Sequence, residues 1–304
     1  SILIVGVIVA LWAFVGGLRG VALTDSLQGA FMIIVSIFAL IWVAYRFEYT
    51  SLPSMGNLMY VPNAIWTPSF FIGLTLPWFF FALTNPQVLQ RLFIPKDLHA
   101  LRKMIIYFGF FGLVYTVIVT YIGISLKILT FQGLFPIVQY RDNVTPTLLS
   151  LMPEWLSLLL ALSIMAAAIT TANSIVLTLS SMVSRDILKE KGIFYGRISI
   201  VVLTIFIGLF AVRKISYIVE LSVLSSTILL CVLPLIFGIF HYKIGKDFTG
   251  AVTLIGGFLI TILLTIFKLS LFGLPTPVTT LIVCFTIFFV IGKIESEYIN
   301  KQKS

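Results

Sequence analysis

The stretch AAAITTANSIVLTLSSMVSRDIL, residues 166–188, combines a membrane-spanning pattern with an unusual number of polar side chains. It belongs to an apolar run over about residues 155–184, which is long enough to cross a bilayer as a helix. Its hydroxyl and amide residues are Thr170, Thr171, Asn173, Ser174, Thr178, Ser180 and Ser181. Either these side chains hold packed helices together, or they bind something polar.

The composition around this stretch is that of a polytopic α-helical membrane protein. Hydrophobic residues make up 60% of the 304 residues and charged residues only 10%, whereas soluble domains average about a quarter charged residues. The alternating segments of about 10 residues that build a transmembrane β-barrel are missing. The first apolar run begins without Met, so we expect this chain to be a piece of a longer protein.

The apolar runs predict nine membrane spans separated by charged or Pro/Gly-rich breaks. They cover roughly residues 1–17, 26–45, 68–91, 104–126, 155–184, 198–212, 215–241, 249–271 and 277–292. Of the loops between them, 127–153 is long enough to hold short surface helices. Cys231 and Cys284 both lie inside apolar runs, which favours small core residues over a disulfide or a metal site.

The net charge of +9 is distributed unevenly between alternate loops. One side collects 14 of the 20 lysines and arginines, namely Arg19, Arg91, Lys96, Arg102, Lys103, Arg185, Lys189, Lys191, Arg197, Lys243, Lys246, Lys293, Lys301 and Lys303. Because positive residues accumulate in cytoplasmic loops, this side and the C-terminus are expected inside the cell. Cytoplasmic loops thus account for the positive charge without a nucleic-acid partner, and we expect a multi-pass protein of the plasma membrane in contact with the lipid bilayer.

The third span, FFIGLTLPWFFFALTNPQVLQRLF (residues 70–93), is predicted to be interrupted. Pro77 removes a backbone hydrogen bond, and Asn85-Pro86 follows about two turns later. Broken helices in transporters place freed carbonyls and half-helix ends around substrate and ions. A simple proline kink is the alternative, and this segment alone favours neither.

The polar seam offers oxygen atoms at helical spacing. Ala167, Thr170, Thr171 and Ser174 recur at i, i+3, i+4 and i+7 and so share one helix face. Neutral hydroxyls and carbonyls can replace the water shell of a hard monovalent cation while leaving its binding weak. Close helix packing with local hydroxyl–carbonyl bonds is the competing interpretation.

Few ionisable residues lie near the spans, and each is a functional candidate. Asp25 lies at the cytoplasmic start of the second span, where it would also serve as an acidic N-cap. Glu220 begins an apolar stretch and fits an interfacial position. His99 and His241 lie at loops, and no acidic pair faces another at a helix centre, so we expect no enzyme.

Four segments together resemble the sodium:solute symporter family. They are GGLRGVALTDSLQGAFMII, NPQVLQRLFIPKD, AAAITTANSIVLTLSSMVSRDIL and LPLIFGIFHYKIGKDFTGAVTLIGG, and they occur in the family's order over most of the chain. The resemblance implies an inverted-repeat leucine-transporter-type core. The chain would hold core helices four to ten plus two accessory helices, as one transporter domain over 1–304 that lacks core helices one to three.

The resemblance also implies sodium sites. The family's main sodium site takes a backbone carbonyl and two hydroxyls from the eighth core helix, and these positions match Ala167, Thr170 and Thr171. A second sodium site or exit path nearer the cytoplasm matches Asp25, Thr170, Asn173 and Ser174. Asn173 replaces a hydroxyl residue there.

For the solute, the family resemblance points to the broken helix. The proline-transporting branch has a Trp, a Tyr four residues on and a Pro four further, where this chain has Trp78, Ala82 and Pro86. The missing Tyr argues against proline. With Phe79 and Asn85 beside them, these residues imply a site for a small organic solute such as an amino acid or a carboxylate.

The implied function is sodium-coupled import by alternating access. A proton-coupled permease of the same fold is one alternative, although the Thr170/Thr171 pair argues against it. A sensor on the transporter fold, or a fragment that cannot transport by itself, is the other alternative.

Overall fold

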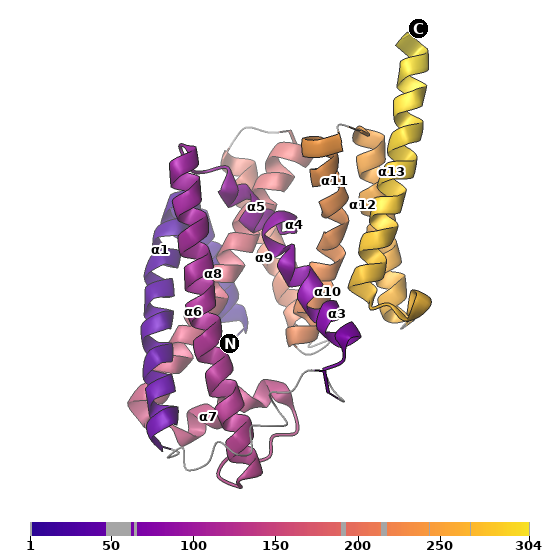
Figure 1. The fold of residues 1–304 in the computed structure, drawn as a ribbon. Coiled ribbons are helices and arrows are strands. Elements are labelled where there is room, and N and C mark those ends of the chain that lie inside the picture. The colour runs from indigo at the N-terminus through magenta and orange to yellow at the C-terminus, as the bar shows by residue number, and fades with distance from the viewer. Residues whose placement is uncertain are drawn as a thin grey trace. The chain divides into compact units, whose positions relative to one another are not determined.

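The computed structural model describes residues 2–46, 62–63, 66–189, 193–213, 218–242, 244–267 and 269–303. Within these ranges the regular structure is entirely helical (Figure 1). The chain divides into two compact units, which are described separately: unit 1 is Ser1–Leu58 with Ile94–Ile215, and unit 2 is Met59–Phe93 with Ser216–Ser304. The single transporter domain over 1–304 stays a prediction.

The membrane-spanning character of the helices is confirmed. Seven helices of the described chain are long and apolar enough to cross a membrane, and two shorter apolar helices cover Ile4–Gly17 and Pro68–Phe79. The shorter two coincide with the first and third predicted spans. The all-α polytopic class therefore holds, while the count of nine spans and the inverted-repeat core stay predictions.

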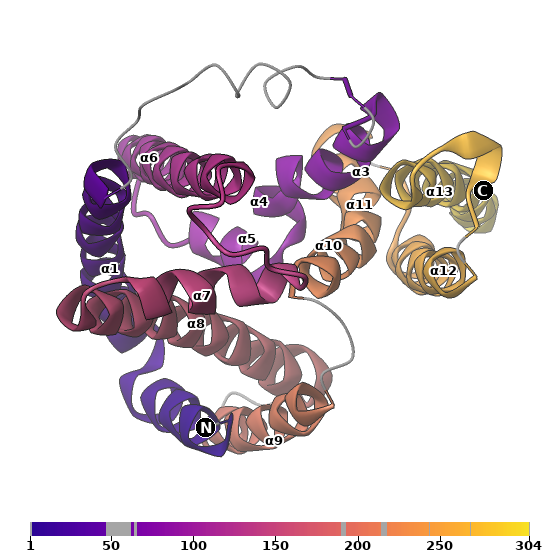
Figure 2. The same cartoon turned by 90° about the horizontal axis from the view of Figure 1, so that it is seen from below.

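Unit 1 is built around a long N-terminal helix. Its elements are α1 (Ile2–Arg46), α6 (Leu98–Phe131), η2 (Arg141–Asn143), α7 (Val144–Leu151), α8 (Glu154–Met182), the π-helical turn η3 (Val183–Ile187) and α9 (Ile193–Val212). α8 packs along α1 and against α9, and α9 also contacts α1 (Figure 1 and Figure 2).

A kink divides α1 into two halves. Gly17 has φ 54° and ψ −162°, a left-handed φ that glycine adopts without the steric cost of a Cβ. The second half runs over Gly20–Arg46. Asp25 therefore lies inside this helix, and the N-cap interpretation of Asp25 was wrong.

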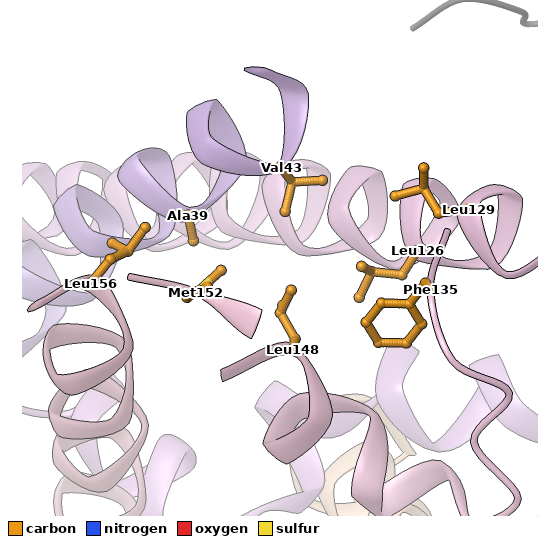
Figure 3. Packing of buried hydrophobic residues seen from close by; sticks show 8 residues of the cluster. All are labelled: Ala39, Val43, Leu126, Leu129, Phe135, Leu148, Met152 and Leu156. Atoms are coloured by element: carbon orange, nitrogen blue, oxygen red, sulfur yellow. The ribbon is translucent and has the colours of Figure 1, made fainter. Parts of the chain in front are cut away.

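The loop predicted between residues 127 and 153 is mostly structured. α6 continues to Phe131, and the short helices η2 and α7 follow. α7 is more than a surface helix, because Leu148 is buried against neighbouring helices. Figure 3 shows this cluster, made of Ala39, Val43, Leu126, Leu129, Phe135, Leu148, Met152 and Leu156. Most of the predicted loop after Arg46 lies outside the described residues.

Two apolar clusters fix the register of α1 against α8. Ala39 and Val43 of α1 share the first cluster with Leu156 of α8. Val9 and Ala13 of α1 share a second cluster with Val176 of α8 and Ile200 of α9. Moving toward the N-terminus of α1 thus means moving toward the C-terminus of α8, so the two helices are antiparallel.

Unit 2 contains a broken helix, a segmented helix and a C-terminal helix pair. Its elements are α3 (Pro68–Phe79), α4 (Phe81–Thr84), α5 (Pro86–Leu92), α10 (Ile218–Leu229), η4 (Leu230–Val232), α11 (Leu233–Phe237), η5 (Gly238–Tyr242), α12 (Asp247–Ile266), η6 (Leu271–Gly273) and α13 (Thr276–Lys303). Cys231 and Cys284 are both buried and unbridged. A Cβ at Gly257 would lie 2.6 Å from Cys231 Cβ and from Cys284 Sγ, so only glycine fits this close approach.

The two C-terminal helices are joined by a side chain as well as by packing. The Glu295 carboxylate on α13 accepts bonds at the start of α12 from Lys246 N (2.7 Å), Thr249 N (3.2 Å) and Thr249 Oγ1 (2.6 Å). Free backbone N–H groups at a helix N-terminus favour a negative charge. Glu295 is thus an N-cap supplied by another helix.

Candidate functional site: a polar layer between α1 and α8 and a broken helix

The predicted interruption of the third span is confirmed at Asn85-Pro86, and a further break lies three residues after Pro77 rather than at it. Pro77 is buried within α3, and the helix ends two residues later at Phe79. Phe80 (φ −92°, ψ 2°) separates α3 from α4, and the extended Asn85 (φ −85°, ψ 117°) separates α4 from α5. Pro86 explains the second break, because the residue before a proline is pushed out of the helical region.

The predicted solute residues surround these breaks in unit 2. Trp78 and Phe79 are exposed within their unit, whereas Ala82, Asn85 and Pro86 are half-buried. The Trp78 and Phe81 ring centroids lie 5.4 Å apart. Aromatic faces thus adjoin the breaks along this segment. No measurement of the structure tests the solute assignment, which stays a prediction.

In unit 1, the hydroxyl of Thr170 on α8 donates a hydrogen bond to the Gln28 Oε1 atom on α1. The two residues are 142 positions apart in the chain. This contact joins the helix with the polar seam to the TDSLQ segment. It also directs an amide oxygen at a residue of the predicted main sodium site.

One turn further along, a second polar layer follows from the antiparallel register. Asp25 lies three residues before Gln28, and Asn173 and Ser174 lie three and four residues after Thr170, so each set shares a helix face. Asn173 is 1% exposed, and its Oδ1 atom accepts no hydrogen bond. A buried amide oxygen without a donor costs free energy, whereas a cation would satisfy it.

The remaining residues of the predicted main site are the half-buried Ala167 and the more exposed Thr171, both on α8. Thr171 is exposed within unit 1, and its Oγ1 donates to the Ala167 carbonyl at 2.9 Å. Because the hydroxyl donates its proton to the carbonyl, the lone pairs of its oxygen stay available to face a cation. All four residues of the i, i+3, i+4, i+7 pattern lie within α8, and their joint role in binding an ion stays a prediction. Thr170 and Ser174 lie on the more buried side.

Gln28 was missing from the predicted site. Its signal is present in the sequence, because it stands one helical turn after Asp25 and repeats the polar face on α1. By contrast, the hydroxyls of Ser180 and Ser181 donate to carbonyls of their own helix, Leu177 O and Thr178 O, both at 2.8 Å. These serines fit the packing interpretation of the seam.

The oxygen atoms of this layer come from hydroxyl, amide and carboxylate groups. The described residues contain no group of three or more His, Cys, Asp or Glu side chains that would hold a metal ion. Mostly neutral oxygens suit a monovalent cation that must leave again. The layer does not suit a tightly held transition metal.

Comparison with known proteins gives one match. Residues 1–244 match the sodium:solute symporter family. No curated protein and no solved structure matches the chain. The matched residues include all of α1, the broken helix and the polar layer, and end before α12.

Proposed function

Because the chain belongs to the sodium:solute symporter family, we propose that it carries sodium and a small organic solute together into the cell by alternating access. Membership makes it a membrane transport protein. The observation that supports sodium coupling most directly is the polar layer between α1 and α8. There the Thr170 hydroxyl bonds to Gln28, and the buried Asn173 oxygen has no donor.

In this proposal sodium binds to α8 at the Ala167 carbonyl and at the hydroxyls of Thr170 and Thr171. When the ion arrives, the Thr170 hydroxyl turns its lone pairs to the cation and gives up its bond to Gln28. The exchange replaces a neutral hydrogen bond by an ion–oxygen contact. Gln28 thus acts as a stand-in partner that keeps Thr170 satisfied between transport cycles.

The second polar layer is proposed as a further sodium site or as the exit path to the cytoplasm. The ion would pass from Thr170 to the oxygens of Asn173, Ser174 and Asp25. Asp25 supplies a negative charge near the cytoplasmic end, which lowers the energy of a cation leaving its neutral ligands. Inward orientation of this end rests on the charge distribution.

The solute is proposed to bind at the broken helix in unit 2. Trp78 and Phe79 offer apolar faces, and Asn85 with the backbone next to Pro86 offers polar groups. A small amino acid or carboxylate with a moderately apolar side chain suits such a surface. Sodium drives uptake only if it binds the solute-competent state more tightly than the other state.

The direct test is solute uptake into cells or proteoliposomes containing the full-length protein. We expect uptake of the right solute to require an inward sodium gradient and to fall at least tenfold when choline replaces sodium. A proton-coupled permease would instead follow an imposed pH gradient in choline medium. Equal uptake in sodium and choline media would refute sodium coupling.

A further inference from the structure

A pocket in unit 1 lies away from the polar layer, beside the Gly17 kink of α1. Its volume is about 290 Å³. It is lined by the last turn of α1 before the kink together with Gly17 itself, by the C-terminal turns of α8 and by the first turns of α9. Two arginines reach this pocket, Arg185 from η3 and Arg197 from α9.

The two guanidinium groups are available for an anion. Arg197 lies over the Phe14 ring at 4.7 Å from its centroid. Such stacking leaves the in-plane N–H donors of a guanidinium free for bidentate bonds to a phosphate. Within the described ranges no acidic residue lines the pocket, and neither arginine forms an ion pair.

Two of the three serine hydroxyls in the pocket lining are already used as donors. Ser180 and Ser181 already donate to carbonyls of α8. Recognition therefore depends on the two arginines. Apart from Ser184, the rest of the lining is glycine or apolar and includes Leu177, Ile193 and Ile200.

An apolar groove follows along the same helix pair. Phe14 meets Arg197, and Gly6 meets Thr204, with 3.8 Å between a Cβ placed at Gly6 and Thr204 Cγ2. α1 and α9 are thus antiparallel, and a pocket of about 310 Å³ opens between Gly6 and Ala10 on one side and α9 on the other. Eight residues of helix place Gly6 about 12 Å from Phe14 at 1.5 Å per residue.

The groove has no polar anchor of its own. Thr204 is its one polar lining residue, and its hydroxyl donates to Ile200 O at 2.8 Å. Val7, Ile205 and Leu209 are 56–63% exposed in unit 1, as side chains that face lipid would be. A charged pocket and an acyl-sized apolar groove therefore follow each other along one helix pair.

We propose that unit 1 binds a phosphate-bearing anion on Arg185 and Arg197, and that this anion is the headgroup of an anionic phospholipid whose acyl chain lies between α1 and α9. Basic pockets at the cytoplasmic ends of membrane helices are suited to such headgroups. A free phosphate ion shares the headgroup chemistry but makes no use of the groove.

The test uses the full-length protein, purified in a neutral detergent and titrated with one ligand at a time while its thermal unfolding is followed. The ligands are dioctanoyl phosphatidylglycerol, dioctanoyl phosphatidylcholine and inorganic phosphate. We expect a saturable rise in the unfolding midpoint with phosphatidylglycerol only. The Arg185→Gln/Arg197→Gln double variant should weaken the apparent affinity at least tenfold, whereas Arg102→Gln, which removes an exposed arginine on α6, should leave it unchanged.

Two further variants separate the headgroup from the acyl chain. Gly208 lines the groove, and a Cβ there has nothing within 4 Å. Gly208→Leu should therefore occupy groove space and weaken phosphatidylglycerol binding while both arginines remain. Arg197→Lys keeps the positive charge but loses the planar guanidinium, so this variant should bind phosphatidylglycerol with intermediate affinity. It tests the same site if the double variant does not fold.

Equal responses of the wild-type protein and the arginine variants would overturn the proposal. The protein could instead respond to inorganic phosphate in a way that needs the arginines but is unchanged by Gly208→Leu. That result would overturn the lipid assignment and assign the anion site to free phosphate.

Discussion

Thr171 and Asn173 stand two residues apart on α8 and differ in their surroundings. Thr171 is exposed in unit 1 and shares its proton with a carbonyl, whereas Asn173 is buried with an oxygen that accepts nothing. The first arrangement is stable without an ion, because every donor has a partner. The second is costly without an ion. The two residues therefore respond differently to substitution.

Thr171→Ala removes one proposed sodium ligand and keeps the helix. Losing one oxygen ligand to a charge costs about 1.5 kcal/mol, which is roughly a tenfold rise in the sodium concentration for half-maximal uptake. Thr286→Ala is the matched control, since Thr286 on α13 is also exposed and makes the same bond to the carbonyl four residues earlier, at 2.9 Å. Equal effects of the two substitutions would favour the packing interpretation.

Asn173→Leu replaces the unsatisfied amide by an apolar side chain of similar size. Without sodium we expect a higher unfolding midpoint, because a buried polar group without a partner costs about 1–3 kcal/mol. Added sodium should then stabilise the variant less than the wild type, since stabilisation by a ligand grows with its affinity. The measurement is thermal unfolding of purified protein with and without sodium.

The exposed Asn143→Leu serves as the control and should leave the sodium response as it is. A variant whose ion-free midpoint falls would show that the Asn173 oxygen has a partner in the folded protein.

The helices were predictable to different degrees. Long apolar runs fixed the existence of α6, α8, α9 and α12, because nothing else satisfies backbone groups in lipid. The observed ends of these helices differ from the predicted ends by several residues. A helix can continue past the membrane as long as its backbone hydrogen bonds form. Pro77 is buried within α3, and the helix ends two residues later at Phe79. Asn85-Pro86 located a break correctly, because the steric clash before proline is local.

Pro86→Ala tests whether the second break in the broken helix matters. Alanine permits a helical conformation at Asn85, so α4 and α5 can join into one helix. We expect the solute KM to rise about fivefold or more with the sodium half-saturation little changed, measured as initial uptake rates. Pro146→Ala in the first turn of α7 should be nearly silent, since the N–H groups of a first turn lack helical partners. Similar kinetics for the two variants would argue against a role for the break.

At the scale of the whole molecule, the sequence determined class and family, while cross-chain contacts needed coordinates. Ala167, Thr170 and Thr171 followed from the family resemblance. Gln28 did not follow from the resemblance, because its contact with Thr170 depends on the antiparallel register of α1 and α8. Apolar clusters far from the site set this register. The arginine pocket was not predicted for the same reason. In the sequence, Arg185 and Arg197 counted only as cytoplasmic charge.

The orientation predicted from that charge has a direct check. Cys231 and Cys284 are 5% and 0% exposed, so they should react little with a membrane-impermeant maleimide. A cysteine at the exposed Asn143 should be labelled on intact cells, and a cysteine at the exposed Lys301 only after permeabilisation. The reverse pattern would invert the topology and place Asp25 at the outer face.

The Glu295 cap of α12 ties together two positions of the chain beyond the matched family region, which ends at residue 244. A carboxylate at 295 without Thr249 loses its hydroxyl donor and keeps only backbone donors, and Thr249 without the carboxylate loses its hydroxyl acceptor. A change at either residue alone therefore weakens the cap. Aligned homologues should therefore inherit positions 249 and 295 as a pair, and lineages that lost one should have lost the other.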